Sequence, residues 1–399
     1  MKPVQLGDVA TFIRGITFKP DDIVELGTDG SVACLRTKNV QADLDLSDVW
    51  AVSRNFVKSD EKLTKPGDII LSTANSWNLV GKASWIPELP WPTTAGGFVS
   101  LLRANPEKVS PRYLYHWLTT DEVQANLRKC ARQTTNISNL NIQQAAALRI
   151  PLPPLPEQKR IAGILDQADA LRRLRARALE KLNTLGQAIF QEMFGAFHDD
   201  YGPWPLQRLE ALIADAQIGA VRGAKEMDDG KPVEYLRMDA IGIDGSLSLE
   251  NLRRVDASQS DLCKYALRSG DFLFNTRNSR ELVGKTAVVR APFPGIFNNN
   301  ILRLRFYGDM TADFLDMFLR TRKGQTVLGA IKSGTTSVFA IYQKSLMALN
   351  VPVPPKDLQQ AYSDRMHELS LARERHVRAV EQASSLFASL QHRTFRGEL

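Results

Sequence analysis

Residues 1–150 alternate short apolar runs with Gly, Pro, Asn and Asp, which is the pattern of β-strands joined by turns. Helical spacing appears within this region in PRYLYHWLTTDEVQANLRK, residues 111–129. Residues 197–350 repeat the alternation of apolar runs and turns. The pattern therefore predicts two mixed α/β domains, one in each region.

Residues 151–196 and 351–399 have a helical period instead. The first segment follows the Pro-rich stretch RIPLPPLPEQ, in which Pro156 suits the first position of a helix. Apolar residues then recur at steps of three and four, which predicts coiled-coil helices. Arg175 interrupts the first series, and Arg365 and His376 interrupt the second. The predicted seam comprises Ile161, Ile164, Ala168, Leu171, Ala178, Leu182, Leu185 and Ile189, and then Tyr362, Leu369, Ala372, Ala379, Ala383, Leu386 and Leu390.

The chain is an internal duplication. GDIILSTANSWNLVGK (67–82) aligns without gaps to GDFLFNTRNSRELVGK (270–285), with nine identities in sixteen columns. LRIPLPP (148–154) likewise matches LNVPVPP (349–355), and the offset between matching segments stays between 201 and 203. Such register over most of the chain indicates a tandem repeat of about two hundred residues.

Connectivity then predicts the architecture. The first helix leaves the first domain and ends at the second, so a second helix with the same seam can return antiparallel beside it. We expect an α+β fold in which two similar mixed α/β domains (1–150 and 197–350) are joined by two long antiparallel coiled-coil helices (151–196 and 351–399) about a pseudo-twofold axis. Alternatively, the helices pair with a second molecule.

Composition places the chain among soluble globular proteins, with 43% hydrophobic and 24% charged residues. The net charge of +7 is spread along the chain and permits binding to a polyanion, although a merely solvated basic surface would look the same. Three isolated cysteines, no secretory signal and no apolar run of roughly 18 residues predict a cytoplasmic protein without a membrane span. Five scattered histidines give no zinc pattern, so we expect no metal.

NSRELVGKTA (278–287) resembles a phosphate-binding loop only superficially. That loop requires GxxxxGK[ST], but Ser279 occupies the first Gly position, as Ser76 does in the other copy. Ala83 replaces the hydroxyl residue after the lysine in the first copy. The repeated segment instead predicts a hairpin tip that carries polar side chains.

Two similar domains at a fixed separation suit a ligand that repeats along a line, such as duplex DNA. The domains share a framework but differ in their loops, as expected if each contacts its own short sequence through side chains. No residue is expected to be catalytic. The candidate DNA-binding residues are Asn75, Ser76, Trp77, Lys82, Arg132, Gln133, Thr134, Thr135 and Asn136 in the first domain, and Arg277, Asn278, Ser279, Arg280, Lys285, Lys332, Ser333, Thr335 and Thr336 in the second.

Structural roles compete with these assignments. The Thr and Asn side chains could instead cap the helix predicted near Asn141, and Trp77 could pack against the hairpin. The basic run at Arg172, Arg173, Arg175 and Arg177 could be a solvated helix face, or could contact phosphates or partner subunits.

The chain resembles the specificity subunit of type I restriction–modification enzymes. The resemblance is carried by IPLPPLPEQKRIAGILD (150–166), the QTTNIS loop (133–138), the GDxxL…GK hairpin in each half and the terminal FRGEL (395–399). The second copy departs from the pattern, because KDLQQ stands where the first has PEQKR.

The resemblance implies two target-recognition domains, each reading one half of a bipartite, asymmetric DNA site, with the helices setting the spacer. It implies partnership with double-stranded DNA, with two methyltransferase subunits that modify adenine, and with motor-nuclease subunits that cleave DNA. S-adenosylmethionine, ATP and Mg would belong to those partners. This chain has no [DN]PP[YF] tetrad and no GxGxxG loop of its own.

Other functions remain open from sequence alone. An enzyme, either a methyltransferase or a nuclease, is disfavoured by the missing motifs. A coiled-coil adaptor that binds only proteins, or a DNA-binding subunit of a related modification system outside type I, would share the same architecture.

Overall fold

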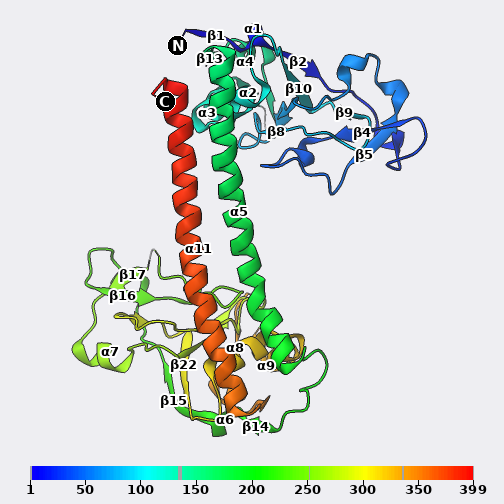
Figure 1. The fold of residues 1–399 in the computed structure, drawn as a ribbon. Helices are drawn as coiled ribbons and strands as arrows, with labels where there is room; N and C mark the ends of the chain where they lie inside the picture. The colour runs from blue at the N-terminus through cyan, green and yellow to red at the C-terminus, as the bar shows by residue number, and fades with distance from the viewer. Residues whose placement is uncertain (1, 134–136, 251, 335–336, 399) are drawn as a thin grey trace. The chain divides into compact units, whose positions relative to one another are not determined.

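The computed structural model describes residues 2–133, 137–250, 252–334 and 337–398, which form two compact units. Unit 1 comprises Met1–Ala176 with Ala379–Leu399, and unit 2 comprises Arg177–Arg378. Each unit therefore contains one globular domain together with part of each of two long helices (Figure 1).

The long helices are α5 (Leu155–Phe194) and α11 (Lys356–Arg396). In unit 1 the first half of α5 packs beside the last half of α11, where Arg175 Nη1 donates a 3.2 Å hydrogen bond to Ala379 O. In unit 2 the second half of α5 packs beside the first half of α11, and the rings of Phe190 and Tyr362 lie 5.4 Å apart. The predicted antiparallel pairing within one chain is confirmed (Figure 1).

The buried faces of these helices differ in register from the predicted seam. Ile161 is buried as expected, but Leu171, Leu185 and Leu386 are exposed by 43%, 43% and 53%, which corrects the prediction at these three positions. Phe190 is buried instead. The reason is that α5 packs against the globular domains as well as against α11, so its buried face is wider than the seam of a two-helix coiled coil. Tyr362 and Ala383 are also buried as expected. The other predicted positions are half-buried: Ile164, Ala168, Ala178, Leu182, Ile189, Leu369, Ala372, Ala379 and Leu390.

A four-stranded antiparallel sheet forms the centre of each unit, with the same strand order in both. In unit 1 the order is β2 (Ala10–Arg14), β10 (Val99–Ala104), β6 (Ile69–Ser72) and β8 (Ala83–Trp85). In unit 2 it is β15 (Ile213–Ile218), β22 (Ile301–Phe306), β18 (Phe272–Asn275) and β20 (Thr286–Val288). The repeat seen in the sequence is thus a repeat of fold.

Each central sheet is covered on both faces, so its strands are apolar at successive positions. In β6, Ile69 and Leu71 belong to the core shared with the helices, whereas Ile70 belongs to the core under a second, outer sheet. The helices on the first face, besides α5 and α11, are α2 (Pro111–Leu118) and α3 (Asp121–Lys129) in unit 1, and α8 (Ala312–Arg320) and α9 (Arg322–Ile331) in unit 2.

The outer sheets also correspond. Both contain a parallel pair, β4–β9 in unit 1 and β16–β21 in unit 2. The strands in spatial order are β3 (Ile23–Val24), β5 (Trp50–Ser53), β4 (Ser31–Leu35) and β9 (Thr93–Ala95) in unit 1, and β17 (Arg253–Val255), β16 (Val233–Leu236) and β21 (Ile296–Phe297) in unit 2.

Short elements complete each unit, and most of them recur in both units. A two-stranded pair precedes each long helix: β1 (Pro3–Gln5) with β13 (Arg149–Pro151), and β14 (Leu206–Arg208) with β25 (Asn350–Pro352). The short helices are α1 (Leu6–Val9), α4 (Ile142–Ala146), α6 (Leu209–Leu212), α7 (Gln259–Lys264) and α10 (Gln343–Met347). No helix in the described parts of the chain combines the length and apolarity needed to cross a bilayer.

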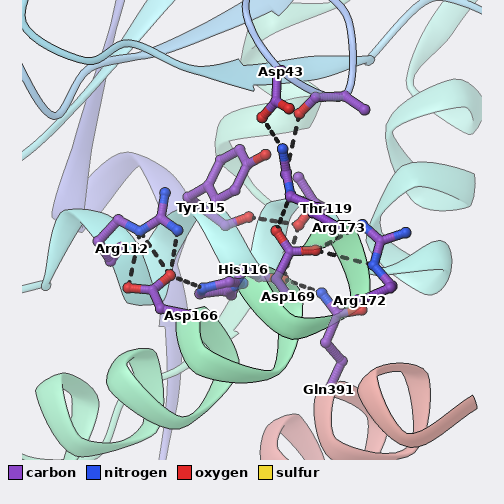
Figure 2. A network of polar contacts seen from close by, with 11 residues as sticks. Asp43, Arg112, Tyr115, His116, Thr119, Asp166, Asp169, Arg172, Arg173 and Gln391 are labelled. Atoms are coloured by element: carbon purple, nitrogen blue, oxygen red, sulfur yellow. Dashed lines mark hydrogen bonds and ion pairs between the residues drawn. The ribbon is translucent and has the colours of Figure 1, made fainter. Parts of the chain in front are cut away.

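A polar network joins α2 to α5 in unit 1 (Figure 2). Asp166 accepts a 2.9 Å hydrogen bond from Arg112 Nε and lies 2.7 Å from Nε2 of the buried His116. Burial would raise the pKa of Asp166, but the hydrogen bonds from His116 and Arg112 outweigh burial and lower it. At the matching positions of unit 2, 201 residues later, Met317 replaces His116 and His367 replaces Asp166, so this network belongs to unit 1.

Candidate nucleic-acid interface

Two segments that the sequence offered as separate candidates meet on one small sheet in unit 1. The sheet consists of β7 (Ala74–Asn75), β12 (Ser138–Leu140) and β11 (Ala131–Gln133). Ser138 of the central strand pairs with Asn75 on one side and with Gln133 on the other. The hairpin that begins at Asn75 and the segment around Gln133 are therefore neighbours.

Unit 2 builds the same sheet from the corresponding segments. Its strands are β19 (Arg277–Asn278), β24 (Phe339–Ala340) and β23 (Ser333–Gly334). Ala340 pairs with both Arg277 and Ser333, so the two candidate segments again converge. We call these two sheets, with the turns that leave them, the tip sheets.

The asparagines of the two hairpins have a structural role. Asn75 Oδ1 accepts a 2.8 Å hydrogen bond from Ser76 N, while its Nδ2 donates to Ser72 Oγ. Asn278 repeats this arrangement with Ser279 N and with Asn275 Oδ1. Each side chain thus shapes the turn that presents the hairpin.

The repeated Gly-Lys pair closes the hairpin. Gly81 has a φ of 85° and Gly284 a φ of 92°, a region that other residues rarely adopt. Lys82 Nζ donates a 2.6 Å hydrogen bond to Gln41 Oε1. Lys285 Nζ donates to Met238 O at 3.2 Å and also to Ile241 O, and burial lowers its pKa. Both lysines bind the protein's own loops, which accounts for the motif without a phosphate ligand.

The candidates differ in exposure. Asn75, Lys82, Asn278, Ser279, Lys285 and Lys332 are half-buried. The exposed candidates, which are free to face a ligand, are Ser76, Trp77, Arg132, Gln133, Arg277, Arg280 and Ser333. Thr134, Thr135, Asn136, Thr335 and Thr336 lie outside the described residues. The cap expected nearby is present, since Asn141 Oδ1 accepts from Gln143 N and Gln144 N at the start of α4.

Arg280 is held at the edge of the tip sheet in unit 2. Its guanidinium lies 5.7 Å from the centre of the Phe339 ring in the central strand. Lys332 Nζ donates a 2.9 Å hydrogen bond to Arg280 O, and burial lowers the pKa of that lysine. Unit 2 therefore has two exposed arginines three residues apart, Arg277 in β19 and Arg280 in the turn that follows it.

Comparisons with known proteins agree with this arrangement. Residues 1–184 match the type I restriction modification DNA specificity domain. The EcoKI specificity subunit of Escherichia coli K12 is 24% identical, over 98% of this chain and 87% of its own length. The StySPI specificity subunit of Salmonella potsdam is 27% identical over the same shares. The crystal structure of the S subunit from M. genitalium matches with a TM-score of 0.64 and 13% identity, over 99% of this chain and 96% of that one.

Residues 1–184 belong to the type I restriction modification DNA specificity domain family, and nearly the whole chain is similar to type I specificity subunits. As a specificity subunit, it fits the role of a non-catalytic member of a multisubunit enzyme, and the resemblance inferred from its motifs is confirmed. Its two similar α/β domains and paired long helices agree with the fold of the solved S subunit.

The tip sheet of unit 1 has an exposed position beside it that sequence reasoning missed. Phe98 O accepts 3.0 Å hydrogen bonds from Thr73 N and Ala74 N, so Phe98 adjoins β7, and its side chain is 63% exposed. In unit 2 the equivalent carbonyl is that of Asn300, which accepts from Thr276 N. The sequence could have indicated this position, because Phe98 follows Gly96 and Gly97 and a Gly-rich turn can leave an aromatic side chain exposed to solvent.

Proposed function

We propose that this specificity subunit reads a bipartite, asymmetric DNA site, with one half-site bound by each domain and the spacer set by α5 and α11. In this proposal it directs adenine methylation by two methyltransferase subunits and ATP-dependent cleavage by motor-nuclease subunits. S-adenosylmethionine, ATP and Mg are bound by those partners. Residues 1–150 and 197–350 are the target-recognition domains, 151–196 and 351–399 are the connecting helices, and the complex acts in the cytoplasm.

The convergence of two candidate segments on a tip sheet in both units supports this proposal most directly. The two tip sheets share a backbone framework but present different side chains, with Trp77 and Arg132 in unit 1 and Arg277 and Arg280 in unit 2. A shared framework with different exposed groups is what two different half-sites require, because base edges are distinguished by side-chain hydrogen bonds and apolar contacts.

Co-expression with the cognate methyltransferase subunits, followed by mapping of methylated adenines across a genome, tests the function. We expect two short, dissimilar sequence elements separated by a constant number of unspecified base pairs. A single continuous element, or methylation that does not depend on this chain, would contradict the proposal.

Lengthening both helices should lengthen the spacer. We propose insertion of one heptad after Ala176 in α5 and one after Arg378 in α11. Seven residues add about 10 Å at about 1.5 Å per residue, which corresponds to about three base pairs at about 3.4 Å each. The methylated sites should keep both half-sites, and the gap between the half-sites should grow by that number of base pairs. The same insertion after Asp29, in the turn between β3 and β4, is the control and should leave the gap unchanged.

Arg280→Ala should relax recognition in the second half-site alone. A bidentate arginine contact to guanine contributes about 1–3 kcal/mol of discrimination at one position. Methylation mapping of the variant should therefore show one degenerate position in the half-site read by unit 2 and an intact first half-site. Arg253→Ala, which removes an exposed arginine of β17 in the same unit, is the matched control. Unchanged preference at every position after Arg280→Ala would remove this residue from the interface.

A further inference from the structure

Each unit contains an acidic turn that contacts one of the two long helices, α5 in unit 1 and α11 in unit 2. In unit 1 this turn spans 40–44 and is closed by a bridge between Val40 and Leu44. In unit 2 it spans 241–247 and is closed by a bridge between Ile241 and Leu247. Both turns leave the outer layer of their unit, since Val40 and Ile241 belong to the cores beneath the outer sheets.

The turn of unit 1 is tied to α5 by an ion pair (Figure 2). Arg173 Nη1 pairs with Asp43 Oδ1, and Arg173 Nη2 donates to Ala42 O at 3.4 Å. The same guanidinium is oriented by Asp169, whose Oδ2 accepts from Arg173 Nε at 2.6 Å. Asp169 is only 7% exposed. Its contact therefore fixes the Arg173 guanidinium against α5, in the orientation that pairs with the turn.

The turn of unit 2 is tied to α11 in the same way. Arg373 Nη2 lies 3.3 Å from Asp244 Oδ2. Arg320, at the end of α8, donates from its Nη1 to Asp244 O and pairs with the buried Asp316. Asp43 and Asp244 are 201 residues apart and occupy equivalent positions, whereas Arg373 corresponds at that offset to Arg172, the neighbour of Arg173. The two units thus make the same kind of contact from adjacent helix positions.

The same turns also hold the hairpins of the tip sheets. Lys82 Nζ bonds to the side chain of Gln41, and Ser84 Oγ donates to Gln41 O, two residues before Asp43. Lys285 Nζ bonds to Ile241 O, three residues before Asp244. One short turn therefore contacts both the long helix and the hairpin, in each unit.

We propose that Arg173 and Arg373 are positioning residues, each of which clamps the acidic turn of its own unit to the long helix and thereby fixes the orientation of the adjacent hairpin relative to that helix. Without the clamp, the outer layer keeps its apolar core, which is non-directional, and the hydrogen bonds between turn and hairpin. It loses the directional contact with the long helix. The hairpin would then face DNA over a wider range of angles. This consequence for site selection depends on the proposed DNA-reading function, whereas the clamp itself does not.

Distances within unit 1 of the full chain test the clamp. Spin labels at two exposed positions, Ala170 on α5 and Lys58 in the outer layer, report the orientation of one part relative to the other. Cys130→Ser and Cys263→Ser remove the accessible thiols. Cys34 can stay, because burial raises its pKa to about 12 and Arg36 offsets this only in part.

Asp43→Asn is the decisive substitution. The Asp43 side chain is 79% exposed, so its loss should leave folding intact, since exposed ion pairs contribute little to stability. We expect the unsubstituted turn to give a single narrow distance distribution, Asp43→Asn to broaden it, and Asp43→Glu to keep it narrow. Asp29→Asn, an exposed carboxylate in the same outer layer, should also leave the distribution narrow. An equally narrow distribution in Asp43→Asn would overturn the clamp.

Methylation mapping then tests the consequence. With Asp43→Asn or Asp244→Asn, the co-expressed complex should accept gaps one base pair shorter or longer, while Asp29→Asn should accept only the original gap. A broadened distance distribution together with an unchanged gap would overturn the role in site selection. Failure of the unsubstituted complex to select any bipartite site would instead contradict the proposed function and leave the distance result standing.

Discussion

Asp68→Ala is expected to destabilise unit 1 by about 3–5 kcal/mol, because it leaves a half-buried arginine without its counter-charge. Arg103 donates to Asp68 Oδ1 from Nε at 2.8 Å and to Oδ2 from Nη2 at 2.7 Å. The Asp68 side chain is 3% exposed and that of Arg103 is 19% exposed, so water cannot replace the pair. The repeated Gly-Asp motif is therefore a fixed link between two strands of the central sheet.

Unit 2 provides an internal test of this prediction. Asp271 is bound by Arg305 at 2.6 Å and 2.9 Å, and its side chain is also 3% exposed. Asp271→Ala should therefore destabilise unit 2 and spare unit 1. Hydrogen exchange of the full chain, followed by mass spectrometry of its peptides, measures the two units separately. Asp60→Ala removes an ion pair whose carboxylate is 87% exposed and should leave exchange in unit 1 nearly unchanged. Equal hydrogen-exchange protection of unit 1 in Asp68→Ala and Asp60→Ala would show that the Gly-Asp motif does not stabilise the unit through its ion pair.

The sequence repeat predicted the fold far better than it predicted what the repeated Gly-Asp and Gly-Lys motifs contact. Gly-Asp and Gly-Lys are visible in both copies, but their partners are distant in sequence, with 35 residues between Asp68 and Arg103 and 41 between Gln41 and Lys82. Duplication identifies the positions that are kept in both copies. It does not reveal which side chains meet, because such contacts are set by the pairing of strands that are not neighbours in sequence.

The tip sheets illustrate the same limit. Spacing and residue type placed candidates near Asn75 and near Gln133, yet nothing local indicated that Ser138 would pair with both. The pairing turns two loops into one surface, and it brings Phe98 to the edge of that surface. The half-burial of Lys82 and Lys285 follows from the same folding, since their ammonium groups satisfy backbone and amide oxygens of another loop.

The register of the long helices depends on partners that the heptad pattern does not contain. A seam drawn through apolar positions passes through Leu185 and Ile189, but the deepest residue of this segment is Phe190, which is fully buried. Its ring is surrounded by those of Phe194, Phe197, Phe314 and Tyr362, at centroid distances of 5.0, 5.7, 5.5 and 5.4 Å. The helix is thus oriented by the aromatic core of unit 2 as well as by α11.

Phe190→Ala is accordingly expected to destabilise unit 2 by about 3–5 kcal/mol, because it removes a buried ring and leaves a cavity between aromatic neighbours that cannot close it. Leu185→Ala, five residues earlier on α5, removes a side chain that is 43% exposed and should change stability little. Urea unfolding followed by circular dichroism measures the loss of stability in each variant. Hydrogen-exchange protection of α8 peptides provides the local readout for unit 2. If the helix were oriented by a heptad seam alone, the ranking would reverse, and Leu185→Ala would be the more destabilising of the two.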